Sequence, residues 1–161
     1  MKPFGKLLVP IDFSTSSSEA IEVAADLSRR YDASVTLVHV YQPVAYPFPE
    51  GFVLYTADQM AGMLTELKKA LDAAVRSARA AGADRVTGEL VQGVVASEVV
   101  SIAERDGYDL IVMGTHGRTG LQHALLGSVA EKVVRRAPCP VLTVRGAPTI
   151  SAEQDVSPRH A

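Results

Sequence analysis

Glycines and a hydroxyl side chain gather in one stretch of the chain that could hold an anion. The stretch contains Gly114, Gly117 and Gly127, and Ser128 follows Gly127 directly. It lies between an apolar run and an amphipathic run. Glycine lets a backbone approach a phosphate closely, and the first N–H groups of a helix attract anions. Residues 114–136 hold four Lys or Arg against one acid. The stretch predicts a phosphate site, and the alternative is that its glycines only form turns.

Two common nucleotide motifs do not fit this spacing. A Walker A loop places a lysine directly before its serine or threonine, whereas Gly127 precedes Ser128 here. A dinucleotide fingerprint follows the first strand of its unit, and these glycines follow the fourth predicted strand. The stretch therefore belongs to neither class.

Other side chains near these elements have both a functional and a plain interpretation. Asp12 follows the first predicted strand, where it either contacts a ligand or caps a helix. Arg118 could pair with phosphate oxygens and His116 could donate to them, or both could be solvated loop side chains. Cys139 lies between two prolines without a patterned base, which favours a small buried hydrophobe over a nucleophile. The pattern names no catalytic residue.

Short apolar runs alternate with amphipathic runs and must position these groups. The apolar runs predict strands at residues 7–11, 35–40, 86–91, 109–113 and 140–144. Apolar residues at helical spacing predict four helices between them, the first starting with a capping box of Ser16 and Glu19. This alternation predicts a five-stranded parallel sheet covered on both faces, a doubly wound α/β sandwich. Ligands of such sheets bind at the carboxyl ends of the strands.

Composition limits the classes of partner. The chain has 161 residues, a formal net charge of −2 and one cysteine. These values favour a single domain in a reducing compartment, and they do not favour nucleic-acid binding. No apolar stretch approaches the roughly 18 residues of a membrane span, and the first residues lack a signal-peptide pattern, so we expect a cytoplasmic protein without a membrane partner.

Two segments fit no regular element. Residues 41–55 combine five of the nine aromatic residues with three prolines, which predicts an ordered loop that serves as a partner surface or a flap. Residues 146–161 are polar and lack periodicity, so we expect a tail outside a domain that spans residues 1–145.

The spacing Gly114-x2-Gly117-x9-Gly127-Ser128 resembles the nucleotide-binding branch of the universal stress protein family. The likeness covers about residues 4 to 145. It includes the opening Val-Pro-Ile-Asp-Phe-Ser at residues 9–14 and the Ala-Pro-Cys-Pro-Val-Leu approach to the last strand at residues 137–142.

The resemblance implies an ATP site, accompanied by Mg²⁺, in a flavodoxin-like fold with strand order 3-2-1-4-5, and frequent homodimers. Carried over position by position, it predicts contacts of four kinds. Pro10, Ile11 and Asp12 line the nucleoside side, Val40 meets the adenine with its backbone, Met113 and Gly114 lie against the ribose, and Gly117, Gly127, Ser128 and Val129 hold the phosphates. His116 and Arg118 complete the predicted set.

Three functions compete at this point. The first is an ATP-binding stress-response protein that acts as a nucleotide-dependent regulator or sensor. The second is a slow ATP hydrolase or phosphotransferase in which Asp12 or His116 orients the attacking group. The third is a nucleotide-independent dimeric interaction protein that uses the aromatic loop. A homodimer is expected through residues 141–144, because this apolar strand lies at a sheet edge in the implied order.

Overall fold

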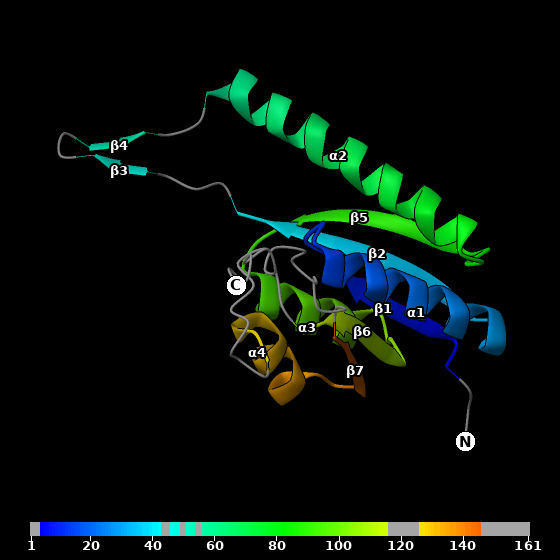
Figure 1. The fold of residues 1–161 in the computed structure, drawn as a ribbon. Coiled ribbons are helices and arrows are strands. Elements are labelled where there is room, and N and C mark those ends of the chain that lie inside the picture. Colours follow the sequence, from blue (N-terminus) through cyan, green and yellow to red (C-terminus); the bar gives the residue numbers. More distant parts are fainter. Residues whose placement is uncertain (1–3, 43–45, 49–50, 54–55, 116–125, 146–161) are drawn as a thin grey trace, which may run out of the picture.

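A five-stranded parallel sheet forms the centre of the molecule (Figure 1), as the sequence predicts. The computed structural model describes residues 4–42, 46–48, 51–53, 56–115 and 126–145. The strand order is β5-β2-β1-β6-β7, which is 3-2-1-4-5 when the five sheet strands are numbered along the chain. The elements are β1 (Lys6–Pro10), α1 (Thr15–Tyr31), β2 (Ser34–Tyr41), β3 (Tyr46–Phe48), β4 (Gly51–Val53), α2 (Ala57–Ala80), β5 (Val86–Gln92), α3 (Val95–Arg105), β6 (Leu110–Gly114), α4 (Ser128–Arg136) and β7 (Val141–Val144).

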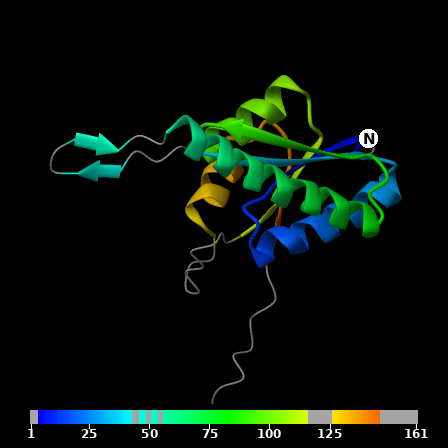
Figure 2. The ribbon, with the colours of Figure 1, turned by 90° about the horizontal axis from the view of Figure 1, so that it is seen from above.

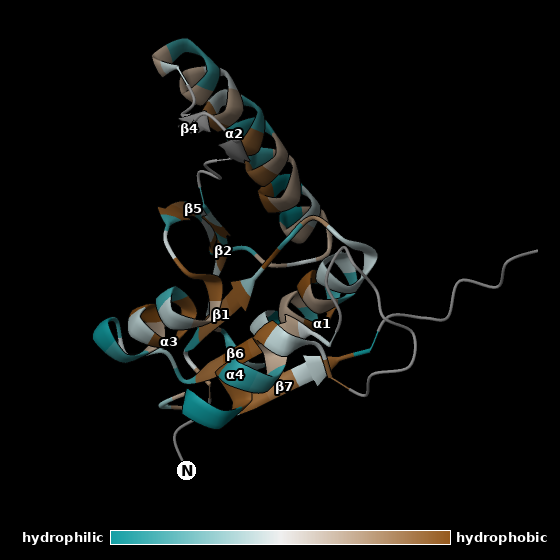
Figure 3. Ribbon diagram, turned by 90° about the vertical axis from the view of Figure 1, so that its left-hand side faces the viewer, coloured by the Kyte–Doolittle hydropathy of each residue, from teal (hydrophilic) through white to brown (hydrophobic). Residues whose placement is uncertain are grey.

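The sheet divides the core into two layers. Successive side chains of a strand point to opposite faces. Leu7 and Val9 of β1 therefore pack in a cluster with α1 and α2, whereas Leu8 packs in a second cluster with α3 and α4. Figure 2 shows α1 and α2 lying side by side over the sheet, and Figure 3 shows hydrophobic β1, β6 and β7 flanked by the helices. The continuous apolar runs are thus strands buried on both faces.

The first helix begins earlier than its predicted capping box. Ser14 is the N-cap of α1, and its side chain accepts a hydrogen bond from the backbone N–H of Ser17 at 3.3 Å. Ser16 already lies inside the helix, so the prediction that Ser16 caps it is wrong. The sequence holds several serines in a row, and only the turn that precedes the helix decides which of them becomes the cap.

A small hairpin occupies part of the segment predicted as a loop. β3 and β4 form a separate antiparallel pair that projects away from the main sheet (Figures 1 and 2), in which Pro47 pairs with Phe52. The prediction of a loop without strands is therefore wrong for these residues. Proline is tolerated in a two-stranded hairpin because each strand has a neighbour on one side only. A residue on the unpaired side needs no N–H for the hydrogen bonds of the pair.

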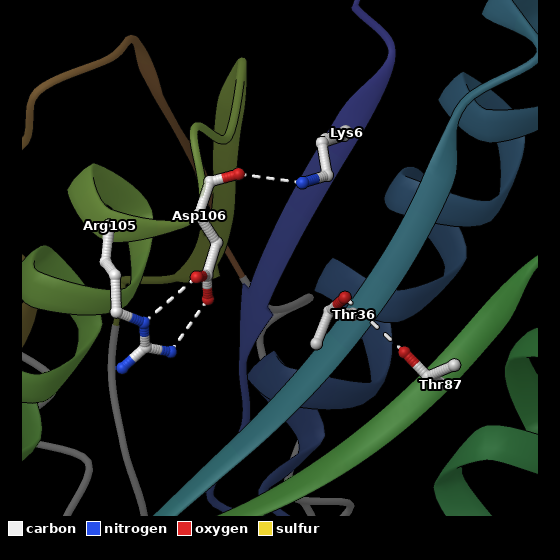
Figure 4. Close-up of polar contacts among 5 residues, drawn as sticks. All are labelled: Lys6, Thr36, Thr87, Arg105 and Asp106. Carbon is white, nitrogen blue, oxygen red and sulfur yellow. Dashed lines mark hydrogen bonds and ion pairs between the residues drawn. The ribbon is translucent and has the colours of Figure 1, made fainter.

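Polar contacts tie α3 to the sheet at the amino ends of the strands (Figure 4). Lys6 Nζ donates to the Asp106 carbonyl at 2.7 Å, and Arg105 makes two hydrogen bonds with the Asp106 carboxylate. The hydroxyls of Thr36 and Thr87 lie 3.5 Å apart between β2 and β5. These contacts lie at the end of the sheet away from the carboxyl ends of the strands. No helix among the described residues is long and apolar enough to cross a membrane.

Candidate functional site

A pocket of about 310 Å³ opens at the carboxyl ends of β1, β2 and β6. This volume is at the lower end of the range for small-molecule sites, which are mostly apolar with a few placed polar groups. Its described lining consists of Pro10, Ile11, Asp12, Ser17, Val38, Val40, Val95, Met113, Gly114, Thr115, Gly127, Ser128, Val129 and Ala130. The pocket therefore lies at the point where the strand order reverses, as expected for a doubly wound sheet.

Pro10 explains why the sheet opens at this point. Ile11 donates its N–H to Val38 of β2 at 2.9 Å, and residues of a central strand face their two neighbours alternately, so Pro10 faces β6. Proline has no N–H to donate. The register between β1 and β6 stops at the pair of Leu8 and Ile111, whereas β1 stays in register with β2 through Pro10.

Asp12 is held by the start of α1. Its Oδ1 accepts hydrogen bonds from the Ser14 N–H at 3.0 Å and from the Ser17 hydroxyl at 2.6 Å. The Asp12 N–H in turn donates to Ser17 Oγ at 3.0 Å. The carboxylate thus organises the turn between β1 and α1 while it also lines the pocket, so the two interpretations of Asp12 left open by the sequence are compatible.

The same turn contains an uncommon backbone conformation. Phe13 has φ 63°, a left-handed value that costs free energy for a bulky residue. Its ring lies 4.5 Å from the ring of His39 on β2, measured between centroids. His39 Nδ1 lies 2.8 Å from the Ile11 carbonyl oxygen, and because a carbonyl only accepts, Nδ1–H is the donor. β2 therefore supports the turn from one side and α1 from the other.

Gly114 has a packing reason that is independent of any ligand. A Cβ at this position would lie 2.6 Å from the Ser16 Cβ and 3.1 Å from Ser16 backbone atoms. The end of β6 therefore touches the first turn of α1 directly, and only glycine allows this approach. The next residue, Thr115, is buried, and its carbonyl accepts the Gly127 N–H at 2.7 Å. This hydrogen bond brings the two ends of the glycine stretch together.

The amino end of α4 forms one wall of the pocket. Gly127 is the N-cap with φ −69° and ψ 157°, and no side chain caps this helix. Ser128 is the first helical residue and not the cap. The first N–H groups of a helix have no intrahelical acceptor and carry the positive end of the helix dipole. The wall formed by Ser128, Val129 and Ala130 is therefore suited to an anionic group.

The pocket brings together most of the residues predicted for the site. Those that line it are Pro10, Ile11, Asp12, Val40, Met113, Gly114, Gly127, Ser128 and Val129. The predicted contacts of His116, Gly117 and Arg118 lie outside the described residues. Sequence reasoning missed Ser17, Val38, Val95, Thr115 and Ala130. The sequence feature that could have indicated Ser17 is its position five residues after Asp12, in the serine-rich start of the helix.

The remaining candidate groups point to no catalytic centre among the described residues. Cys139 is only partly buried, and burial raises the pKa of its thiol, which disfavours a reactive thiolate. It packs against the core layer of α3 and α4 as a small hydrophobe, but it is half-buried and not buried as predicted. No group of three or more His, Cys, Asp or Glu side chains in the described parts of the chain could hold a metal ion. Asp12 is the one acidic side chain in the described pocket lining.

Comparison with known proteins decides the family. The profile of the Universal stress protein family matches residues 3–145. The chain belongs to the universal stress protein family. It is 37% identical over 147 residues to the Universal stress protein MJ0531 of Methanocaldococcus jannaschii, covering 88% of this chain and 82% of that protein. It is 32% identical to the Universal stress protein YxiE of Bacillus subtilis, covering 88% of this chain and 99% of the other.

A solved structure of this universal stress protein fold contains a nucleotide. A universal stress protein in complex with cAMP superposes with a TM-score of 0.70 at 26% identity, covering 90% of this chain and 99% of the other. The bound cAMP is an observation on that protein.

Proposed function

We propose that this universal stress protein binds ATP in the pocket between β1 and β6 and acts as a nucleotide-dependent regulatory or sensor module. The observation that carries the proposal is the combination of groups in one pocket. Ile11, Val40 and Met113 form the apolar part of the pocket, here called the slot, and the Asp12 carboxylate and the amino end of α4 line the same pocket.

The slot and the carboxylate suit a nucleoside. A flat apolar base gains free energy when it leaves water for a mostly apolar crevice. A carboxylate accepts hydrogen bonds, so Asp12 would receive an amino or hydroxyl donor of the nucleoside. The solved relative with cAMP supports an adenine nucleotide as the ligand class.

The amino end of α4 suits the phosphates. Its N–H groups and dipole favour negative charge, and a glycine at the N-cap leaves room for a close approach. Mg²⁺ would arrive with ATP, because this ion is usually held by one or two carboxylates together with phosphate oxygens. Because Asp12 is proposed to contact the nucleoside, phosphate oxygens and water would hold the ion.

The wider setting follows from the same proposal. The chain would work in the cytoplasm without membrane or nucleic-acid partners, and two copies would pair through the edge strand β7. In this proposal nucleotide occupancy carries the signal.

A titration series on two variants tests the proposal. The φ and ψ of Gly127 are open to any residue, so Gly127→Val leaves the backbone unstrained and places methyl groups where phosphates would bind. We expect Gly127→Val to weaken ATP binding far more than adenosine binding. Asp12→Ala should weaken adenosine, AMP, ADP, ATP and cAMP alike, by about 10- to 150-fold for a lost charge-assisted hydrogen bond.

Isothermal titration and thermal shift measure these affinities, and Gly62→Ala serves as a control because Gly62 lies on α2, outside the described pocket lining. A Gly127→Val protein that is folded by circular dichroism and binds ATP like the parent would refute the phosphate site.

A further inference from the structure

Ser17 is a polar residue of the pocket lining that the resemblance did not assign to the site. Its side chain comes from the first turn of α1, and the residue is 5% exposed. Its hydroxyl donates to Asp12 Oδ1 at 2.6 Å and accepts the Asp12 N–H at 3.0 Å. A hydroxyl has one proton to donate, so the donor capacity of Ser17 is used within the protein.

These two hydrogen bonds fix Asp12 from two directions. The bond to Oδ1 sets the orientation of the carboxylate, and the bond to the N–H sets the backbone just before Phe13. Oδ1 also accepts the Ser14 N–H at 3.0 Å, so the carboxylate bridges the residue after the turn and the helix. The short distance to Ser17 is typical of a charge-assisted hydrogen bond to a carboxylate.

The turn needs this support because Phe13 has a left-handed backbone. A strained conformation persists only where its surroundings over-determine it. His39 supports one side of the turn through the Ile11 carbonyl and the Phe13 ring. On the other side, Ser17 connects Asp12 to α1, which is itself fixed against β6 by the contact of Ser16 with Gly114.

We propose that Ser17 is a positioning residue of the nucleotide pocket, acting on the ligand through Asp12. This inference rests on the proposed function, because it assigns to Asp12 a contact with the nucleoside. Removal of the hydroxyl would take away one of the two described hydrogen bonds to Oδ1 and so loosen the carboxylate, and it would let Asp12 shift and relieve the strain at Phe13.

A double-mutant cycle separates this role from a direct contact. We expect Ser17→Ala to weaken adenosine, AMP and ATP in equal proportion, by about tenfold or more. Inorganic triphosphate, which lacks the nucleoside, should bind the variant as it binds the parent. In an Asp12→Ala background, Ser17→Ala should cause no further loss. A further loss of the same size in that background would show that Ser17 contacts the ligand itself and would overturn the proposal.

Two variants control for a merely structural effect. Ser28 is a second buried serine of α1, 4% exposed, whose hydroxyl donates to the Ala33 carbonyl at 2.7 Å at the other end of the helix. Ser28→Ala should lower the thermal midpoint without changing nucleotide affinity. Ser17→Thr keeps the hydroxyl and should retain most of the affinity. If Ser28→Ala weakened binding as much as Ser17→Ala, the effect would be general loosening and the proposal would be wrong.

A measurement without ligand keeps this inference separate from the proposed function. Amide hydrogen exchange of the unliganded protein should speed up at Asp12 and Ser14 in Ser17→Ala, because both N–H groups depend on this network. The amides of Leu7 and Leu8 in β1 should be unchanged. Unchanged exchange at Asp12 and Ser14 would refute the positioning role even if ATP binds. If exchange is faster but the protein binds no nucleotide, Ser17 does organise the turn. The nucleotide proposal would then be refuted, and with it the action of Ser17 on a ligand.

Discussion

Single residues at this pocket serve the fold and the candidate site together. Pro10 ends the ladder with β6, Asp12 organises the turn into α1, and Gly114 lets the first turn of α1 touch β6. Each of the three residues therefore has a structural role in addition to any contact with a ligand. Substitutions at the pocket will therefore change stability and binding at once, and each needs a matched control elsewhere.

Gly114 allows a test of this coupling at the residue scale. Gly114→Ala places a methyl group 2.6 Å from the Ser16 Cβ, so we expect it to destabilise the protein by about 1–3 kcal/mol. Gly62 in α2 has nothing within 4 Å of a Cβ, and Gly62→Ala should stabilise the protein by roughly 0.5–1 kcal/mol. Urea unfolding measures both changes, and equal midpoints for the two variants would contradict the close approach of Ser16.

At the scale of elements, α2 is anchored by one half only. Its buried residues, Leu71 and Ala78, both lie in the second half, where the helix packs on β5 so closely that a Cβ on Gly88 would meet Leu71 and Val75 at 2.9 Å. The first half extends beyond the sheet (Figure 1) and is fixed by a capping box, in which Thr56 and Gln59 exchange hydrogen bonds of 2.9 and 3.2 Å. Local and tertiary interactions thus stabilise different halves of one helix.

The two halves should respond differently to substitution. Thr56→Ala removes the cap and should fray the first turns, raising amide exchange near Met60 with little change in the free energy of global unfolding. Leu71→Ala should instead lower that global free energy by about 2–5 kcal/mol, because it leaves a cavity under the helix. Exchange monitored by NMR with urea unfolding measures both. A global loss from Thr56→Ala as large as that from Leu71→Ala would show that α2 unfolds as one unit.

At the scale of the whole molecule, the edge strand β7 is the proposed contact between two copies. The Pro140 carbonyl accepts the N–H of Ile111 in β6 at 3.0 Å. The Val144 carbonyl accepts the N–H of Thr115, the residue after β6, at 2.9 Å. Because backbone groups alternate along a strand, Leu142 also faces β6 and the N–H of Thr143 points to the free edge. Leu142 is 39% exposed, and an exposed apolar edge favours pairing with another copy.

This alternation yields a matched pair of proline variants. Thr143→Pro removes an outward donor, and in a symmetric dimer it does so twice, so association should weaken by about 10- to 100-fold while the monomer stays folded. Leu142→Pro removes a donor towards β6 and should lower the stability of the monomer itself. Sedimentation velocity over a range of concentrations checks the first expectation. A parent protein that sediments as a monomer throughout would rule out the dimer.

The sequence was sufficient for the architecture because its strands are buried on both faces. Runs such as residues 109–113 are too short for a helix, and their alternation with helices predicts a parallel sheet covered on both faces. The strand order itself came from the resemblance to the family. Pattern reasoning failed at the hairpin, where three prolines suggested irregular structure, and at the α1 cap, where several serines competed. In both cases the structure depends on contacts between particular residues, the pairing of β3 with β4 and the capping hydrogen bond of Ser14, and composition does not reveal such contacts.

The candidate site was predictable in place and less so in detail. The carboxyl ends of β1, β2 and β6 followed from topology alone. Ser17 and His39 were not predicted, because their contacts depend on the left-handed backbone at Phe13, which an aromatic residue seldom adopts. Gly114 was assigned to the ribose from the resemblance, and the structure adds a packing reason from α1.

The interrupted ladder at Pro10 also has a mechanical consequence. β1 is joined to β2 by five register pairs and to β6 by two, so we expect a force that pulls along the strands to separate β1 from β6 before it separates β1 from β2. The pocket lies across this seam, with Pro10 and Asp12 on one side and Met113 and Thr115 on the other. A molecule seated there bridges the two halves of the sheet and adds resistance at its mechanically weakest line.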